Sequence, residues 1–304
     1  MLKGKKLKKG HTIGIVAPAN SGSKGEILRA KIELENLGYR VKLGEHIFDT
    51  WNSFAGIDKD RVSDINNFFR DSEIDAIMCL RGGFGSIRIV KDLDIEMIKK
   101  NPKIFIGYSD ITTLHSALNQ KAGIITFHGP MATSNFFDID KFTLDSFIES
   151  VRNTKPKEII NPEELRSFTK GKTSGVVIGG NLTTLMGDMG TFNELDFKDK
   201  ILFIEEIKEP TYKIDRALSQ LLNSGKLNQL NGIILGDFNN CNPGSKSDIS
   251  LMDLLGDRLK KLNIPIIYNF KSGHCKPMVT LPLGIELEID CDNLTIKSLE
   301  GAVK

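Results

Sequence analysis

The 304-residue chain has few cysteines, one tryptophan and almost no net charge. Its 41 basic and 39 acidic residues leave a formal charge of +2, which excludes the strong attraction that nucleic acids and anionic membranes exert on basic proteins. The cysteines show neither the paired short spacings of a zinc knuckle nor a disulfide framework, so we expect reduced, mostly buried thiols. They are Cys79, Cys241, Cys275 and Cys291.

Long apolar runs are also missing, and none reaches the roughly 18 residues that a membrane span requires. Lysines at positions 3, 5, 6, 8 and 9, followed by Ile13 to Ala19, imitate the start of a secretory leader. The apolar stretch contains Gly14 and is too short for a leader core, which needs about 7 to 15 apolar residues. We therefore expect a first buried strand that ends in a Pro-Ala-Asn loop, and a cytoplasmic protein.

The pattern in the first half of the chain is an alternation of apolar strands and amphipathic helices, typical of a doubly wound, largely parallel sheet. The helix expected at 24–37 has an apolar stripe formed by Ile27, Leu28, Ile32, Leu34 and Leu37. Further helices are expected at 59–69 and 110–120, and strands at 12–17, 40–43, 74–80, 104–107 and 124–127.

The length predicts two domains at about 150 residues each. Residues 153–173 lose apolar periodicity and are rich in Lys, Glu, Pro and Ser, so we expect a linker between domains at 1–152 and 174–304. The alternating run at 285–289 predicts a half-exposed antiparallel strand, so the second domain should be a mixed α/β domain. Its other strands are expected at 175–178, 200–204, 232–235 and 264–270.

A serine stands where one of these strands gives way to a helix. Ser109 follows the strand at 104–107, and the helix start behind it leaves backbone N–H groups free to face the serine. Such a turn at the carboxyl edge of a parallel sheet suits a nucleophile. The alternative is that Ser109 or Asp110 only caps the helix.

A glycine cluster at 81–86 lies between the strand at 74–80 and a helical stretch at 87–93. Its N–H groups suit a phosphate or an oxyanion. It lacks the Gly-Lys-Ser/Thr ending of a P-loop and does not fit Gly-x-Gly-x-x-Gly. A purely structural tight turn is therefore the alternative.

The histidines are few enough to consider singly as a general base. His115 is six residues beyond the serine on the same expected helix, about 9 Å along the axis, which excludes it. His11 and His46 lie in polar connections with nothing nearby to orient them. His128 and His274 both follow apolar strands, and either is placed to reach a cleft.

Two carboxylates follow the apolar strand at 201–204. Glu205 and Glu206 are costly to bury at a strand end unless they are paired, and a histidine is a natural partner. The alternative is a solvated strand terminus.

Taken together, these segments resemble the LD-carboxypeptidases, a serine peptidase family that includes muramoyl-tetrapeptide carboxypeptidases and microcin-immunity peptidases. The resemblance covers nearly the whole chain, in order. It rests on 107–112, 81–85, 128–130, 179–182, 203–206, 212–216 and 273–274. It implies cleavage of an L,D-peptide bond, with release of terminal D-alanine from cytosolic murein tetrapeptides during peptidoglycan recycling. The alternative within the family is an immunity peptidase that hydrolyses peptidyl- or aminoacyl-nucleotide toxins.

The resemblance also implies a site. It assigns Ser109 as nucleophile, Glu205 as the orienting acid and His274 as general base, in a cleft between the domains. It implies a homodimer acting on a small peptide, with no metal, cofactor, nucleic acid or membrane. The implied oxyanion hole is built from the backbone N–H groups of Asp110, Gly82 and Gly83, and the substrate carboxylate would meet Arg81 and Asn181.

Two positions depart from the family pattern. Glu206 stands where aspartate is more common, which leaves open which of the two carboxylates is the acid. Phe84 replaces a tyrosine and loses its hydroxyl.

Two other classes remain as rivals. One is a non-catalytic nucleotide-binding protein with phosphate on the glycine cluster. The other is an α/β-hydrolase, whose Gly-x-Ser-x-Gly elbow is not satisfied because Ile111 takes the place of the last glycine.

Overall fold

The computed structural model describes residues 1–245 and 248–304, and it divides the chain into two compact units. The first unit comprises Met1–Thr154, Thr280–Gly284 and Gly301–Lys304, and the second comprises Lys155–Val279 and Ile285–Glu300. The chain therefore returns to the first unit twice after leaving it. Among the described residues, no helix is long and apolar enough to cross a membrane.

This division corrects the predicted boundaries in two respects. The expected linker at 153–173 contains β6 (Lys157–Glu158) and β7 (Arg166–Ser167), which pair in the sheet of the second unit. The late segment β12 (Leu281–Leu283), expected in the second domain, pairs antiparallel with β5 (Thr126–His128) in the first unit. Short pairing segments of this kind carry too little apolar periodicity to be recognised in a sequence.

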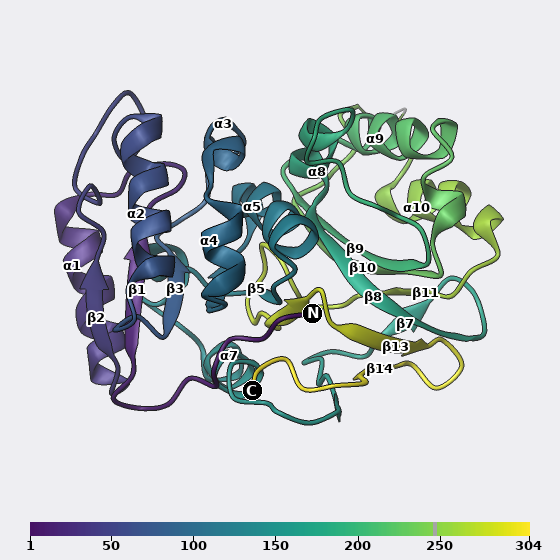
Figure 1. The fold of residues 1–304 in the computed structure, drawn as a ribbon. Helices are drawn as coiled ribbons and strands as arrows, with labels where there is room; N and C mark the ends of the chain where they lie inside the picture. Colours follow the sequence, from purple (N-terminus) through teal and green to yellow (C-terminus); the bar gives the residue numbers. More distant parts are fainter. Residues whose placement is uncertain (246–247) are drawn as a thin grey trace. The chain divides into compact units, whose positions relative to one another are not determined.

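The sheet of the first unit confirms the predicted doubly wound architecture (Figure 1). Its described strands run in the order β12-β5-β4-β3-β1-β2, and all neighbours are parallel except β12 with β5. The order reverses beside β1, so the carboxyl ends of β1, β3 and β4 and the loops that follow them share one sheet edge. The remaining strands are β1 (Thr12–Val16), β2 (Arg40–Leu43), β3 (Ala76–Cys79) and β4 (Ile104–Gly107).

Helices connect these strands, as the periodicity predicted. Helix α1 (Lys24–Asn36) starts at a capping box in which Ser23 and Glu26 satisfy each other's backbone N–H groups. Its predicted apolar stripe is too wide, because Leu28 and Ile32 are 39% and 54% exposed. The others are α2 (Asp58–Arg70), α3 (Ser86–Ile89), η1 (Val90–Asp92), α4 (Ile95–Lys100), η2 (Ser109–Ile111), α5 (Thr112–Ala117), η3 (Leu118–Ala122), α6 (Ala132–Asn135) and α7 (Lys141–Ser150).

The second unit is a mixed α/β domain, as predicted. Its described strands run in the order β6-β14-β13-β8-β9-β10-β11-β7, with a parallel centre from β8 to β11 and antiparallel flanks. The run at 285–289 forms the predicted antiparallel strand, here β13 (Glu286–Asp290). The others are β8 (Lys172–Asn181), β9 (Lys200–Ile207), β10 (Gly232–Asn239), β11 (Ile266–Tyr268) and β14 (Thr295–Ser298).

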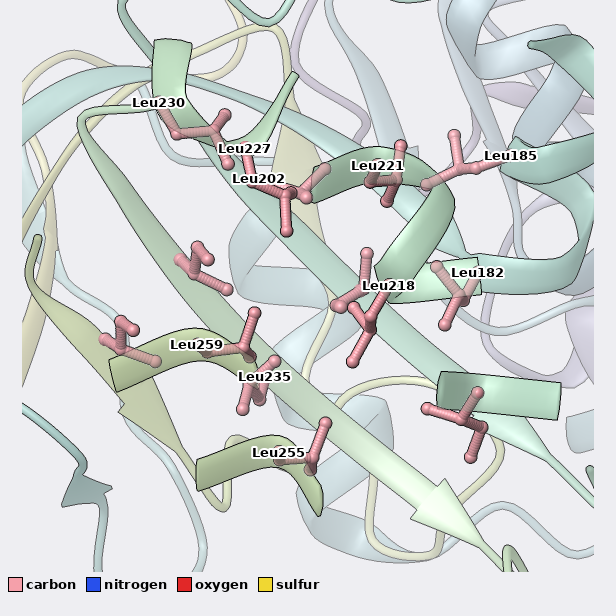
Figure 2. Packing of buried hydrophobic residues seen from close by; sticks show 14 of the residues in the cluster. Leu182, Leu185, Leu202, Leu218, Leu221, Leu227, Leu230, Leu235, Leu255 and Leu259 are labelled. Atoms are coloured by element: carbon pink, nitrogen blue, oxygen red, sulfur yellow. The ribbon is translucent and has the colours of Figure 1, made fainter. Parts of the chain in front are cut away.

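Helices α8 (Leu182–Asp188), α9 (Thr211–Asn223) and α10 (Leu251–Leu259) cover one face of this sheet, with η4 (Leu227–Gln229) and η5 (Lys260–Leu262) nearby in the chain (Figure 1). Leucines of the helices pack against Leu202 and Leu235 of the strands (Figure 2). Because side chains alternate along a strand, Leu202 and Ile204 face this core and Glu205 faces the opposite side of β9. The alternation thus separates Glu205 from Glu206.

Candidate active site

Ser109 occupies a strained turn between β4 and the following helices. Its φ of +65° lies in the left-handed region, which residues other than glycine rarely adopt. Such conformations persist where the surroundings impose them, and they concentrate at functional sites. Neither Ser109 nor Asp110 acts as a side-chain N-cap of η2 or α5, whose cap positions are Tyr108 and Ile111. The capping alternative is therefore wrong.

The glycine cluster lies against this serine. A Cβ on Gly82 would stand 2.9 Å from Ser109 Cβ and 3.6 Å from the Asp110 backbone nitrogen, so only glycine permits the approach. The buried Asp110 carboxylate accepts the Ser86 N–H at 2.8 Å and ties the serine turn to the cluster. Burial raises the pKa of Asp110, and the hydrogen bonds from Ser86 oppose that rise.

Two further side chains fix the cluster, and the sequence analysis assigned a role to neither of them. Asn20 Oδ1, in the loop after β1, accepts the Phe84 N–H at 3.0 Å. The fully buried Arg61 guanidinium donates to the Pro18 carbonyl at 2.5 Å and to the Gly85 carbonyl at 3.1 Å. Burial lowers the pKa of Arg61. Asn20 had one signal, its position at the carboxyl end of the first strand, whereas Arg61 had none because it acts from the middle of a helix.

In the second unit, the structure brings Glu205 and His274 together. Glu205 Oε2 lies 2.7 Å from His274 Nδ1 and accepts the His274 backbone N–H at 3.3 Å. A Cβ on Gly273, where φ is +116°, would stand 2.5 Å from Glu205 Oε2, so glycine is required at this turn. Glu205 is fully buried while the His274 side chain is 15% exposed, and Asn239 Nδ2 donates to the His274 carbonyl at 2.5 Å.

The buried environment of Glu205 disfavours the ionised form of its carboxyl group. Burial raises the pKa of this carboxyl, and His274 is the main influence in the opposite direction. In a histidine that donates Nδ1–H to a carboxylate, Nε2 is the ring nitrogen that accepts a proton, which is the arrangement of a general base with its orienting acid.

Glu206 has a different role. Its carboxylate accepts hydrogen bonds from Asn181 Nδ2 at 2.9 Å, from the Thr183 N–H and hydroxyl at 2.8 and 2.7 Å, and from the Ile207 N–H at 2.8 Å. Glu206 thus stabilises the start of α8, and Glu205 is the carboxylate that faces His274. Asn181 caps the same helix, accepts from Thr184 at 3.0 Å and is 5% exposed. Its amide is engaged in the fold, contrary to the expected contact with a substrate carboxylate.

The other predicted residues fall into distinct environments. Arg81 is half-buried next to the glycine cluster. His128 is fully buried beside the Tyr108 ring, so the expectation that it reaches a cleft is wrong. His115 is also buried, with Nε2 2.9 Å from the Gly107 carbonyl, and burial lowers its pKa to about 4.

His46 corrects another expectation, because Asp49 orients it at 2.8 Å. In the described part of the chain, His46, Asp49 and Asp60 are a group whose potential ligand atoms lie within 4.8 Å of one another. The four cysteines are free thiols, and three of them are buried, as predicted.

Ser109 thus belongs to the first unit, and His274 and Glu205 belong to the second. The family models for the LD-carboxypeptidase N-terminal domain and the LD-carboxypeptidase C-terminal domain match residues 13–129 and 174–289. These two ranges contain the serine turn and the Glu205–His274 pair, respectively.

Comparisons with whole proteins agree with these matches. The chain is 41% identical over 288 residues to a probable murein peptide carboxypeptidase of Bacillus subtilis, covering 93% of this chain and 89% of that protein. It is 32% identical over 327 residues to the microcin C7 self-immunity protein MccF of Escherichia coli, covering 96% and 94%. A solved structure of MccF in complex with glutamyl sulfamoyl guanosine superposes with a TM-score of 0.93, at 28% identity and 100% coverage of both chains.

Proposed function

Because this chain belongs to the LD-carboxypeptidase family and is thus a carboxypeptidase, we propose that it releases terminal D-alanine from murein tetrapeptides by a Ser-Glu-His mechanism. The observation that carries the mechanism is the 2.7 Å contact between the buried Glu205 carboxylate and His274 Nδ1. The substrate class is supported by the relative named for murein peptides.

In this mechanism Ser109 Oγ attacks the carbonyl carbon of the last peptide bond. His274 Nε2 takes the serine proton and then delivers it to the leaving amine of D-alanine, while Glu205 holds the imidazole in the required tautomer. Water then attacks the acyl-enzyme with the same histidine as base. The proposal requires Ser109 and His274 to reach hydrogen-bond distance in the working enzyme.

The tetrahedral intermediate carries a negative oxygen that needs preorganised donors. We assign this role to the backbone N–H groups of Asp110, Gly82 and Gly83, because the glycine turn contacts the serine and is fixed by neighbouring side chains. Arg81, half-buried beside the turn, is a candidate for binding the substrate carboxylate. The proposed chemistry uses no metal and no cofactor. We further propose that the protein is a cytoplasmic homodimer. Sedimentation of the purified protein would test this oligomeric state.

The second candidate function is immunity-type hydrolysis of aminoacyl- or peptidyl-nucleotides. The 32% identity to MccF and the superposition on its complex with an aminoacyl sulfamoyl nucleoside favour keeping it. Both candidates use the same nucleophile, acid and base and differ in the group that flanks the scissile bond.

The deciding experiment gives the purified protein a murein tetrapeptide and an aminoacyl sulfamoyl adenosine side by side, with EDTA present. The proposal expects D-alanine release with the larger kcat/KM on the tetrapeptide. A preference for the nucleoside would establish the second candidate. Nucleotide binding without hydrolysis of either compound would leave a non-catalytic binding protein and refute both.

A further inference from the structure

A row of three aromatic rings lies beside the glycine cluster of the first unit. The Trp51 and Phe54 rings stack with centroids 5.9 Å apart, and the Phe54 and Phe84 rings follow at 5.7 Å. Phe54 is buried, whereas Trp51 and Phe84 are 42% and 55% exposed. Neighbouring exposed aromatic side chains are unusual on the surface of a folded protein, and beside a candidate nucleophile they fit a ligand-binding role.

The row is held in place before any ligand arrives. Trp51 and Phe54 exchange two backbone hydrogen bonds of 3.0 Å. The Arg61 guanidinium lies 4.7 Å from the Phe54 ring centroid, and the Phe84 N–H is bound by Asn20. A preorganised surface of this kind binds without a large loss of side-chain entropy.

The row lies within reach of the reacting bond. Phe84 is two residues from Gly82, at most about 7 Å along the chain, and Gly82 contacts Ser109. Removal of the last residue of a tetrapeptide leaves three residues on the acyl side, which span about 10 Å when extended. A group attached to the amino end of that peptide therefore falls in the distance range of the aromatic row.

The arginine side chains beside the aromatic row indicate which chemical group could bind there. Arg88 lies 5.6 Å from the Trp51 ring centroid, but its guanidinium is engaged with Asp58 through Nε at 3.0 Å and Nη2 at 2.8 Å. Asp58 also pairs with Arg61, so two guanidiniums share one carboxylate. Arg61 is fully buried and Arg88 donates Nε and Nη2 to Asp58, so neither guanidinium offers a forked pair of donors to a phosphate. Aromatic faces beside guanidiniums whose donors are already engaged suit a ring with apolar C–H faces and hydroxyl groups at its edge.

From these observations we propose that Trp51, Phe54 and Phe84 form a subsite for the sugar attached to the amino end of a murein peptide. The inference rests on the proposed function and deepens it, because it makes the glycopeptide, rather than the free peptide, the preferred substrate.

Trp51 is the only tryptophan of the chain and serves as the probe. Its fluorescence is titrated in the Ser109→Ala variant with a disaccharide-tetrapeptide, the free tetrapeptide and AMP. The proposal expects a saturable change with the disaccharide-tetrapeptide at a concentration about tenfold below that for the free peptide, the equivalent of one strong aromatic contact. A response to AMP alone, or no response to any ligand, would overturn the sugar assignment.

Turnover provides a second, independent test. In Trp51→Ala, kcat/KM should fall about tenfold for the disaccharide-tetrapeptide and stay within about twofold for the free tetrapeptide, whereas Trp51→Phe should keep most of the activity. Phe48→Ala is the matched control, because Phe48 is 44% exposed near Lys24 and outside the row. Equal losses on both substrates would refute the subsite. A fluorescence response without any hydrolysis by the wild type would refute the proposed function and support the subsite.

Discussion

Replacement of Glu205 by glutamine tests the assigned acid with almost no change in volume. The carboxylate is fully buried, and its Oε2 accepts from both the Nδ1–H and the backbone N–H of His274. An amide removes the charge and places an NH2 group where an acceptor is needed, so the imidazole loses its orientation, its tautomer and the partner of its protonated form.

The magnitude follows from the nature of this contact. The charge-assisted hydrogen bond alone contributes about 1.5 to 3 kcal/mol. When the tautomer is lost as well, a serine triad loses about 10⁴-fold in kcat, equivalent to about 5 kcal/mol of transition-state stabilisation. We therefore expect kcat of Glu205→Gln to fall by about 10³- to 10⁴-fold, with a smaller change in KM.

Glu206→Gln is the matched control. Glu206 is also buried, but its oxygens hold the start of α8 through Asn181 and Thr183. Its substitution should cost about 1 to 3 kcal/mol of unfolding free energy and leave kcat within about tenfold of the wild type. The assay is D-alanine release at saturating tetrapeptide, with thermal unfolding measured on each variant. A larger kcat loss in Glu206→Gln than in Glu205→Gln would refute the assignment.

Three other predictions concern the first unit. Gly82→Ala should lower kcat by at least about 10²-fold, because the added Cβ collides with Ser109 and displaces an oxyanion donor. Gly25→Ala is the control: its added Cβ meets open space in α1, so this variant should keep full activity in the same assay. Arg61→Lys retains the charge but not the forked donors, so kcat should fall at least about tenfold with KM little changed, and an unchanged kcat would contradict the positioning role. His115 has a pKa of about 4 in the folded state and 6.5 in the unfolded state, so the unfolded state binds more protons between these pH values and the protein loses stability as the pH drops from 6.5 to 4. His115→Gln should remove about 3 kcal/mol of this pH dependence of the unfolding free energy, measured by urea unfolding; an unchanged pH dependence would contradict the prediction.

The sequence was sufficient wherever local patterning decides the structure. The parallel strands of both units, the turn at Ser109 and the glycine cluster all follow apolar runs that end in turn residues. The alternation of side chains along β9 also places Glu205 and Glu206 on opposite faces of the sheet. This alternation could identify the acid only once the structure showed which face the helices cover.

The rest depended on long-range contacts. The return of β12 to the first sheet, the cap made by Asn181 and the anchoring of the glycine cluster by Arg61 join residues distant in sequence. Such contacts produce no periodic pattern in the sequence. From the sequence alone, a buried arginine on a helix cannot be distinguished from an exposed one.

The central claim is that Ser109 is the nucleophile of a carboxypeptidase acting on murein tetrapeptides. The most direct measurement is the rate of D-alanine release by wild-type protein and by Ser109→Ala at equal concentration. The account predicts release by the wild type and a loss of about 10⁴-fold or more in the variant. Release by Ser109→Ala within about tenfold of the wild-type rate would contradict it.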